Sequence, residues 1–156
     1  MRVAIFDLDE TVIDSSHRTP NNPDGTLNLA AYIEKHTPAN VRRDKLLPLA
    51  RIMRECYASG CYVIVLTARF MHSCDYQFLA RHGLNYHRLF SREQANEKHQ
   101  SLSDGEYKAR FILPILKLKQ FRNASVVMFD DAAKVKTALR KHFPVLCAKR
   151  INSRIK

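Results

Sequence analysis

Residues 3–11 read VAIFDLDET, and this stretch decides the fold. Val3 to Leu8 is a short apolar run that ends among acids, which is typical of a buried strand. Two further runs have the same form, CYVIVL at 61–66 and ASVVMF at 124–129. All three are continuously apolar rather than alternating, so both faces of the sheet that they form should be covered. Runs of this kind indicate a parallel sheet in an α/β protein.

Helical spacing and turn-forming residues separate these runs. Apolar residues at helical spacing predict a helix over 45–59 that ends before Gly60. The other expected elements are helices over 29–36, 75–81, 106–119 and 132–142, strands over 86–90 and 145–148, and loops over 14–28 and 91–105. The 156 residues fit one domain, a parallel sheet sandwiched by helices, with a small cap inserted after the first strand at approximately 15–45.

Polar side chains follow three of the expected strands. In open α/β sheets the working residues lie just beyond the carboxyl ends of the strands. The residues at these positions are Asp7 and Asp9, Thr67 and Arg69, and Asp130 and Asp131. Each alone is explained as a capping or turn residue. Four gathered carboxylates, however, would repel one another unless a cation lay among them, and oxygen ligands without His or Cys suit Mg²⁺.

Four segments, taken in order, resemble the motifs of haloacid dehalogenase-type (HAD) phosphohydrolases. The segments are FDLDET at 6–11, VIVLT at 63–67, Lys108, and FDD at 129–131. The resemblance covers the whole chain and implies a Rossmann-like fold and phosphatase activity. It implies that Asp7 attacks phosphorus to form an aspartyl-phosphate. Asp9 would protonate the leaving oxygen and then activate water.

The same resemblance implies the phosphate and metal ligands. Thr67 would hydrogen-bond the transferring phosphoryl oxygens, and Lys108 would neutralise their charge. Other lysines nearby, Lys98, Lys117 and Lys119, are further candidates for that second role. The implied Mg²⁺ ligands are the carboxylates of Asp7 and Asp130 and the backbone carbonyl of Asp9, with Asp131 as a second metal-side acid, directly or through water.

Within the superfamily, the local pattern is similar to the 3′-phosphatase domain of bacteriophage-type polynucleotide kinase/phosphatases. The similar segments are Arg18-Thr19-Pro20, GCYVIVLTAR at 60–69 and FDDAAKVKTALRKHFPV at 129–145. The similarity implies that Arg18 and Arg69 bind the substrate phosphate or the strand, for which the planar guanidinium is suited. Two features depart from that branch: no GxxxxGK[ST] phosphate loop is present, and Glu10 replaces its usual Gly.

The hypothesis that follows is removal of 3′-phosphates from nucleic acid ends, because a small cap should leave an open mouth for an extended substrate. A 5′(3′)-(deoxy)nucleotidase acting on free nucleotides is the first alternative. A protein phosphatase is the second, since DLDETV at 7–12 is similar to the DLDETL of carboxy-terminal-domain phosphatases. A degenerate fold that only binds nucleic acid would need a broken motif, and none is broken.

Composition narrows the partners. The chain has 26 Lys and Arg against 15 Asp and Glu, and its charge of +11 favours nucleic acid or nucleotides. No apolar run reaches the roughly 18 residues of a membrane span, and no secretory signal is evident, so a soluble, cytoplasmic protein is expected. No obligate protein partner is evident. Four cysteines without CxxC spacing are expected to be reduced thiols rather than zinc ligands: Cys56, Cys61, Cys74 and Cys147.

Overall fold

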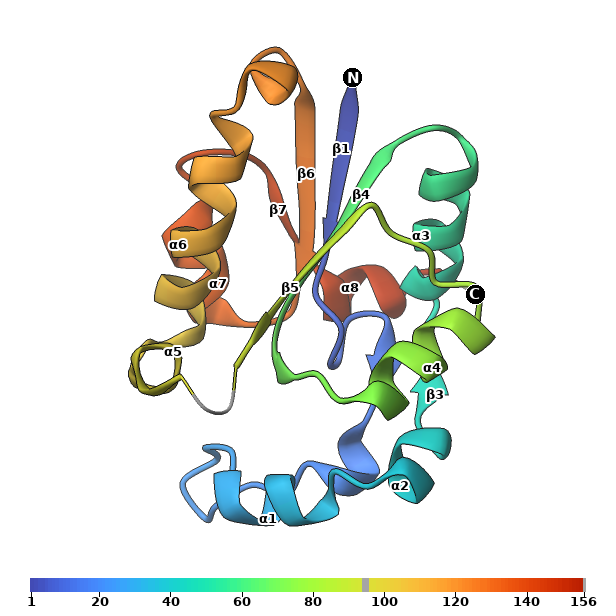
Figure 1. Ribbon diagram of the computed structural model, residues 1–156, viewed down its shortest axis with the longest axis vertical. Coiled ribbons are helices and arrows are strands. Elements are labelled where there is room, and N and C mark those ends of the chain that lie inside the picture. Colours follow the sequence, from blue (N-terminus) through green and yellow to red (C-terminus); the bar gives the residue numbers. More distant parts are fainter. Residues whose placement is uncertain (94–95, 156) are drawn as a thin grey trace.

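A five-stranded parallel sheet forms the centre of the computed structural model, which describes residues 1–93 and 96–155 (Figure 1). Its order is β5-β4-β1-β6-β7, and all four neighbouring pairs are parallel. The strands are β1 (Arg2–Phe6), β4 (Tyr62–Phe70), β5 (Arg88–Arg92), β6 (Ser125–Asp130) and β7 (Val145–Cys147). The predicted α/β class and parallel sheet are confirmed.

Helices cover both faces of the sheet, as the continuously apolar strands predict. On one face, Val3, Ile5, Ile64 and Leu66 pack in a cluster with α6 (Asp104–Leu116) and α7 (Ala133–Leu139). On the other face, the alternate strand residues pack against helices that Figure 1 shows on the opposite side of the sheet. These helices are α3 (Leu49–Ala58), α4 (Ser73–Arg81) and α8 (Ala148–Asn152).

A separate segment lies beyond the carboxyl ends of the strands, at the bottom of Figure 1. It is held by a short antiparallel pair, β2 (Ile13–Asp14) with β3 (Lys45–Leu46). Between these strands the chain forms η1 (Ser16–Arg18), α1 (Leu29–Lys35) and α2 (Pro38–Arg42). Asn28 caps α1 by accepting a hydrogen bond from Ala31 N. We call residues 15–44 the insert.

Several expected boundaries are wrong, for local reasons. The helix expected over 45–59 begins only at Leu49, because Lys45–Leu46 pairs with β2. Pro38, two residues beyond the helix expected over 29–36, opens the unpredicted helix α2 at a position where its missing N–H costs nothing, after the capping residue Thr37. The sequence analysis missed α8, and it placed β5 two residues too early.

The segment expected to be a loop over 91–105 also contains regular structure. It holds the end of β5, the short helix α5 (Glu97–Ser101) and the start of α6. Ser103 and Glu106 form a reciprocal capping box at that start, a signal that lies in the sequence as Ser-x-x-Glu. Residues 94–95 of the expected loop lie outside the described residues. Within the described part of the chain, no helix is long and apolar enough to cross a membrane.

Helices α6 and α7 pack closely because Gly105 lies between them. A Cβ at Gly105 would lie 2.8 Å from the carbonyl oxygen of Lys134 and 3.3 Å from the Cβ of Ala138. Only glycine therefore permits this approach without a shift. The contact fixes the first turn of α6. Lys108 lies one turn further along this helix, and its side chain contacts Asp7 and Asp130 at the strand ends.

Candidate active site

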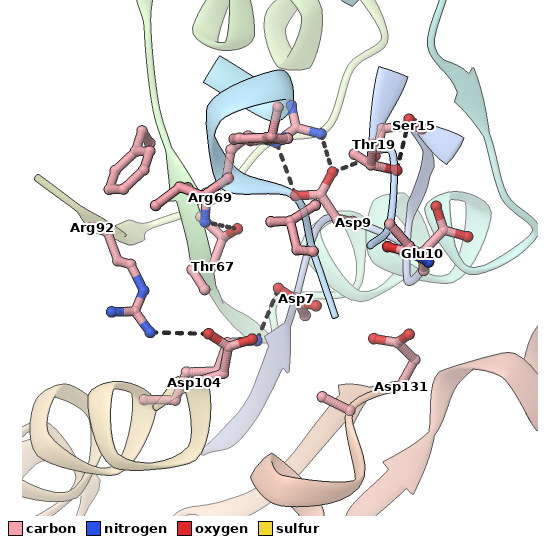
Figure 2. Close-up of a pocket in the computed structure, with 18 of the residues that line it drawn as sticks. Asp7, Asp9, Glu10, Ser15, Thr19, Thr67, Arg69, Arg92, Asp104 and Asp131 are labelled. Atoms are coloured by element: carbon pink, nitrogen blue, oxygen red, sulfur yellow. Dashed lines mark hydrogen bonds and ion pairs between the residues drawn. The ribbon is translucent and has the colours of Figure 1, made fainter. Parts of the chain in front are cut away.

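Three neighbouring strands end at one place and bring their polar residues together (Figure 2). In the order β4-β1-β6, Thr67 lies in β4 two residues past its last pair with β1, Asp7 directly follows β1, and Asp130 ends β6. Asp7 is fixed through its backbone, since Asp7 N donates to Phe129 O at 3.1 Å. Parallel pairing in this register therefore places the polar residues that the sequence spreads over more than 120 positions at a single edge.

Lys108 joins two of the acids. Its Nζ lies 2.9 Å from Asp7 Oδ1 and 2.6 Å from Asp130 Oδ2. Burial raises the pKa of Asp7 well above its usual value; Lys108 opposes this rise, and the neighbouring acids Asp130 and Asp9 add to it. Burial alone would lower the pKa of Lys108, but the two carboxylates raise it, so the ammonium stays charged. Lys108 thus supplies a fixed positive charge between Asp7 and Asp130.

Three acids are close enough to share a metal ion. Carboxylate oxygens of Asp7, Asp130 and Asp131 lie within 4.8 Å of one another. Asp130 is fully buried and is oriented by Ala132 N, which donates to its Oδ1 at 2.8 Å. Burial, and then the charge of Asp130, raises the pKa of Asp131. These three carboxylates offer only oxygen atoms as ligands and carry more negative charge than Lys108 alone can balance. Such a set fits Mg²⁺.

Arg69 holds Asp9 with two nitrogens. Nη2 lies 2.5 Å from Asp9 Oδ1 and Nε lies 3.1 Å from Oδ2, while Ser15 Oγ donates to Oδ1 at 2.5 Å. Burial would raise the pKa of Asp9, but the charge and hydrogen bonds of Arg69 outweigh it and lower that pKa to about 2. Arg69 also reaches Thr67, whose Oγ1 accepts from Arg69 N at 3.1 Å.

Two buried acids that the sequence analysis missed anchor the arginines. Asp75 Oδ1 accepts from Arg69 Nη1 at 2.7 Å. Asp44 accepts from Nε and Nη2 of Arg18 at 2.9 and 2.8 Å, and its Oδ2 lies 3.7 Å from Arg69 Nη2. Asp44 belongs to the insert and Asp75 to α4, and neither lies beside a motif, so no local signal marks them.

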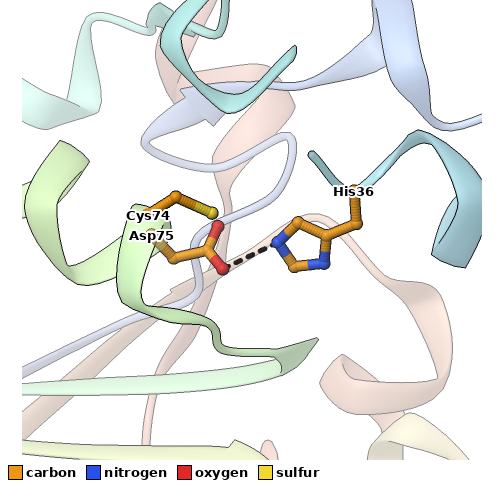
Figure 3. Close-up of side chains that lie close together, drawn as sticks. All are labelled: His36, Cys74 and Asp75. Carbon is orange, nitrogen blue, oxygen red and sulfur yellow. Dashed lines mark hydrogen bonds and ion pairs between the residues drawn. The ribbon is translucent and has the colours of Figure 1, made fainter. Parts of the chain in front are cut away.

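His36, Cys74 and Asp75 form a second cluster of possible metal ligands (Figure 3). Both oxygens of Asp75 are already engaged, one by Arg69 and the other by His36 Nε2 at 2.7 Å. The pKa of Asp75 is lowered because the hydrogen bond from His36 and the charge of Arg69 outweigh burial. The cluster therefore connects the insert, which carries His36, to the arginine that holds Asp9. The four cysteines are free thiols.

A cavity of about 610 Å³ opens above Asp7. The insert contributes the residues on one side, including Asn21, Leu27, Leu29 and Tyr32. The opposite side is lined by Phe70, Arg92, Gln100 and Asp104, and Arg92 pairs with Asp104 at 2.9 Å. Tyr32 is 5% exposed, and its hydroxyl has no hydrogen-bond partner among the described residues.

Most of the residues selected from the sequence meet at this cavity. Those that line it are Asp7, Asp9, Thr67, Arg69, Lys108 and Asp131. Asp130 lies beneath it, in contact with Lys108. Arg18 does not line it: it is 1% exposed and lies behind Arg69, paired with Asp44. Glu10 also lines the cavity and has φ 56°, a left-handed conformation that glycine adopts more readily than glutamate.

Comparison with known proteins agrees with this geometry. The family described as "Bacteriophage T5 5′-deoxynucleotidase" matches residues 1–156. The chain belongs to this family. A 5′-deoxynucleotidase of Escherichia phage T5 is 31% identical over 170 residues, which cover 97% of this chain and 68% of the phage protein.

Solved structures agree on the fold of this family member. A chain of the Pnkp1/Rnl/Hen1 RNA repair complex is similar with a TM-score of 0.65 and 22% identity over 94% of this chain. This chain spans only 42% of that one. A haloacid dehalogenase-like hydrolase of Streptococcus pneumoniae also gives a TM-score of 0.65, with 13% identity and coverage of 94% and 84%.

The solved structures confirm the haloacid dehalogenase-like fold, and the family and its phage relative confirm a phosphatase. Of the substrate hypotheses, the named phage relative favours the nucleotidase alternative over the 3′-phosphatase. The likeness to the RNA repair complex is a likeness of fold.

Proposed function

We propose that this phosphatase releases the 5′-phosphate of free deoxynucleoside monophosphates, with Asp7 as nucleophile. The cavity of about 610 Å³ above Asp7 carries the proposal, because pockets of roughly 300–1,000 Å³ suit small molecules. Its polar floor of Asp7, Thr67 and Lys108 suits a phosphate, and Leu27, Leu29 and Tyr32 of the insert offer apolar contacts to a nucleoside. The family and the phage relative support the same substrate. A free-nucleotide substrate also agrees with the expected cytoplasmic location.

The chain's own residues account for the transfer. A carboxylate oxygen of Asp7 attacks phosphorus, the bond to the nucleoside 5′-oxygen breaks, and an aspartyl-phosphate forms. Lys108 Nζ, 2.9 Å from Asp7 Oδ1, offsets the negative charge that meets there. Thr67 Oγ1 lies beside Asp7 at the adjacent strand end, where it can donate to a phosphoryl oxygen.

Asp9 acts as the general acid and then as the general base. It gives a proton to the leaving 5′-oxygen and later takes one from the water that hydrolyses the aspartyl-phosphate. In its pair with Arg69 the carboxylate form is favoured, which suits the second step. A substrate phosphate bound near Arg69 would offset the positive charge of the guanidinium. The pKa of Asp9 would then rise, and protonation of Asp9 for the first step would become easier.

Mg²⁺ fits the three clustered acids and completes the proposal. Asp7, Asp130 and Asp131 would hold it, with the backbone carbonyl of Asp9 as a further ligand. When bound, the ion neutralises charge between a carboxylate nucleophile and a phosphate dianion.

The second candidate is 3′-phosphate removal from nucleic acid ends. The fold likeness to the RNA repair complex and the charge of +11 favour it. Against it, Arg18 is paired with Asp44 and lies outside the cavity lining, so it is not placed to follow a strand. The protein-phosphatase hypothesis gains no support from the relatives named above.

A substrate panel tests the proposal. Phosphate release is measured from 5′- and 3′-deoxymononucleotides, 5′-ribomononucleotides, oligonucleotides with a 5′- or 3′-phosphate, and a phosphopeptide. The 5′-deoxymononucleotides should give the highest kcat/KM. A higher value for the 3′-phosphorylated oligonucleotide would replace the proposal with the second candidate.

A further inference from the structure

The excess of positive over negative charge in this protein lies in one part of the chain. Residues 1–106 contain thirteen Lys and Arg against thirteen Asp and Glu, so they are neutral overall. Residues 107–156 contain thirteen Lys and Arg and only two acids, Asp130 and Asp131. Both of these acids belong to the active site. The whole net charge of +11 therefore comes from the last third of the sequence.

The fold places this segment around the β7 end of the sheet, with α6 and α7 on one face and α8 on the other face, next to α3. Strand β7 is the edge strand of the sheet beyond β6. Helix α7 packs beside β7 and against α6, and α8 packs beside β7 on the other face. Figure 1 shows these elements in orange and red, with α6 and α7 on the side of the sheet away from α3 and α4. We call the surface of residues 107–155 around β7 the cationic edge.

The cations of this edge are accessible, and the segment itself supplies few acids to balance them. Ten of them are exposed, and none forms an ion pair with a carboxylate of a described residue. The ten are Arg110, Lys117, Lys119, Arg122, Lys134, Arg140, Lys141, Lys149, Arg150 and Arg154. A surface without acids over this extent opposes self-association by like charge and attracts polyanions.

The side chains exposed on the cationic edge favour contact with phosphate groups over contact with bases or lipid. Every aromatic ring of Phe, Tyr or Trp type in residues 107–155 is buried or half-buried, so no platform for base stacking is exposed there. Large exposed apolar side chains in this range are limited to Leu118 and Leu146, which is little for insertion into a lipid surface. Lysines and arginines without stacking partners suit the phosphate backbone of a duplex, read without regard to sequence.

We propose that the cationic edge binds the phosphate backbone of double-stranded DNA, separately from the hydrolytic site. None of the ten exposed cations lines the cavity above Asp7. Binding at the edge therefore leaves the cavity open to a mononucleotide. It would keep the phosphatase close to a polymer whose hydrolysis by a nuclease supplies 5′-phosphorylated nucleotides. The binding itself does not depend on the proposed substrate.

A matched pair of triple variants tests the edge. The edge variant carries Lys119→Gln, Lys141→Gln and Arg150→Gln, one from each of three elements or their ends. The control variant carries Arg42→Gln, Arg81→Gln and Arg88→Gln, which are equally exposed cations of the neutral part. Both variants lose three positive charges. Binding of a fluorescent 30-base-pair duplex is followed by anisotropy over a range of salt concentrations, with hydrolysis of a 5′-deoxymononucleotide measured in parallel.

The edge variant should bind the duplex at least tenfold more weakly at low salt, and its slope of log K against log salt should fall by about 3, since each phosphate contact contributes about 0.9. The control should keep most of the wild-type affinity, and both variants should keep wild-type hydrolysis. Equal losses in both variants, or no loss in either, would overturn the proposal. So would equally tight binding to anionic lipid vesicles, or a strong preference for single strands. Failure of mononucleotide hydrolysis in the wild-type protein would count against the proposed function alone.

Discussion

Arg69 binds both carboxylate oxygens of Asp9, through Nη2 at 2.5 Å and Nε at 3.1 Å. The third nitrogen, Nη1, binds Asp75, and Asp75 binds His36 of the insert. The orientation of the proposed acid–base residue is thus linked to the position of the insert by consecutive buried contacts. Any closing or opening of the insert would act on Asp9 through this connection.

Replacing the nucleophile should separate activity from stability. Asp7→Asn keeps the shape of the side chain but removes its attacking oxygen, so we expect kcat to fall by roughly 10³-fold or more. Burial and the neighbouring acids disfavour the charge of Asp7, so the melting temperature should stay the same or rise. Phosphate release and thermal unfolding measure the two effects. Retained turnover would show that Asp7 is not the nucleophile.

Removing metal should abolish activity. The clustered acids Asp7, Asp130 and Asp131 repel one another without a cation, so we expect no turnover in chelator and full recovery with Mg²⁺. Bound metal should also raise the melting temperature, because the ion binds the folded chain preferentially. Asp131→Asn should raise the Mg²⁺ concentration needed for both effects. Full activity in chelator would contradict the metal site.

Asp75→Asn should destabilise the protein in a pH-dependent way. The substitution weakens a buried ion pair with Arg69, which costs about 3 kcal/mol in comparable cases. The folded-state pKa of Asp75 is lowered, so its contribution is complete above the unfolded pKa of about 3.9 and is lost as pH falls through the folded value. The difference in free energy of unfolding between the wild-type protein and the variant should be constant from about pH 5 upward and should become smaller below pH 4. Urea unfolding at several pH values measures it, and a gap that widened in acid would contradict the assignment.

Tyr32→Phe should lower activity without lowering stability. Its buried hydroxyl has no partner among the described residues, so its removal leaves no group unsatisfied, and the melting temperature should hold or rise. Because Tyr32 lines the cavity, we expect its hydroxyl to bind the nucleotide, and kcat/KM should fall about tenfold. Steady-state kinetics with a 5′-deoxymononucleotide gives the comparison. Unchanged kcat/KM would place the hydroxyl outside the substrate contacts.

Gly105→Ala should loosen the contact between α6 and α7. The added methyl would meet Lys134 O at 2.8 Å, and overpacking of this kind costs about 1–3 kcal/mol. Since α6 also carries Lys108, a shift of the helix should reduce kcat as well. Thermal unfolding and kinetics together test this, with Gly25→Ala as a control in the insert, where a Cβ meets nothing within 4 Å but φ is 83°. Loss of stability in the control alone would show that the helix contact tolerates the methyl.

The parallel sheet and the meeting of its polar residues could be predicted from the sequence. Continuous apolar runs can be satisfied only by burial on both faces, and parallel strands necessarily end together, so Asp7, Thr67 and Asp130 had to converge. Lys108 was chosen among several lysines through the family resemblance, and the structure brings it to Asp7 and Asp130.

The tertiary structure alone decided how the two arginines are used and which side chains enclose the substrate. Arg18 and Arg69 were expected to face a phosphate, but their partners Asp44 and Asp75 lie far from them in sequence or carry no motif, and a buried guanidinium must find such partners. The cavity between the insert and the strand ends likewise depends on how the insert folds back, which no local pattern encodes. The number of charges can be counted from the sequence, but only the fold decides that their carriers lie around β7, with α7 on one face of the sheet and α8 on the other.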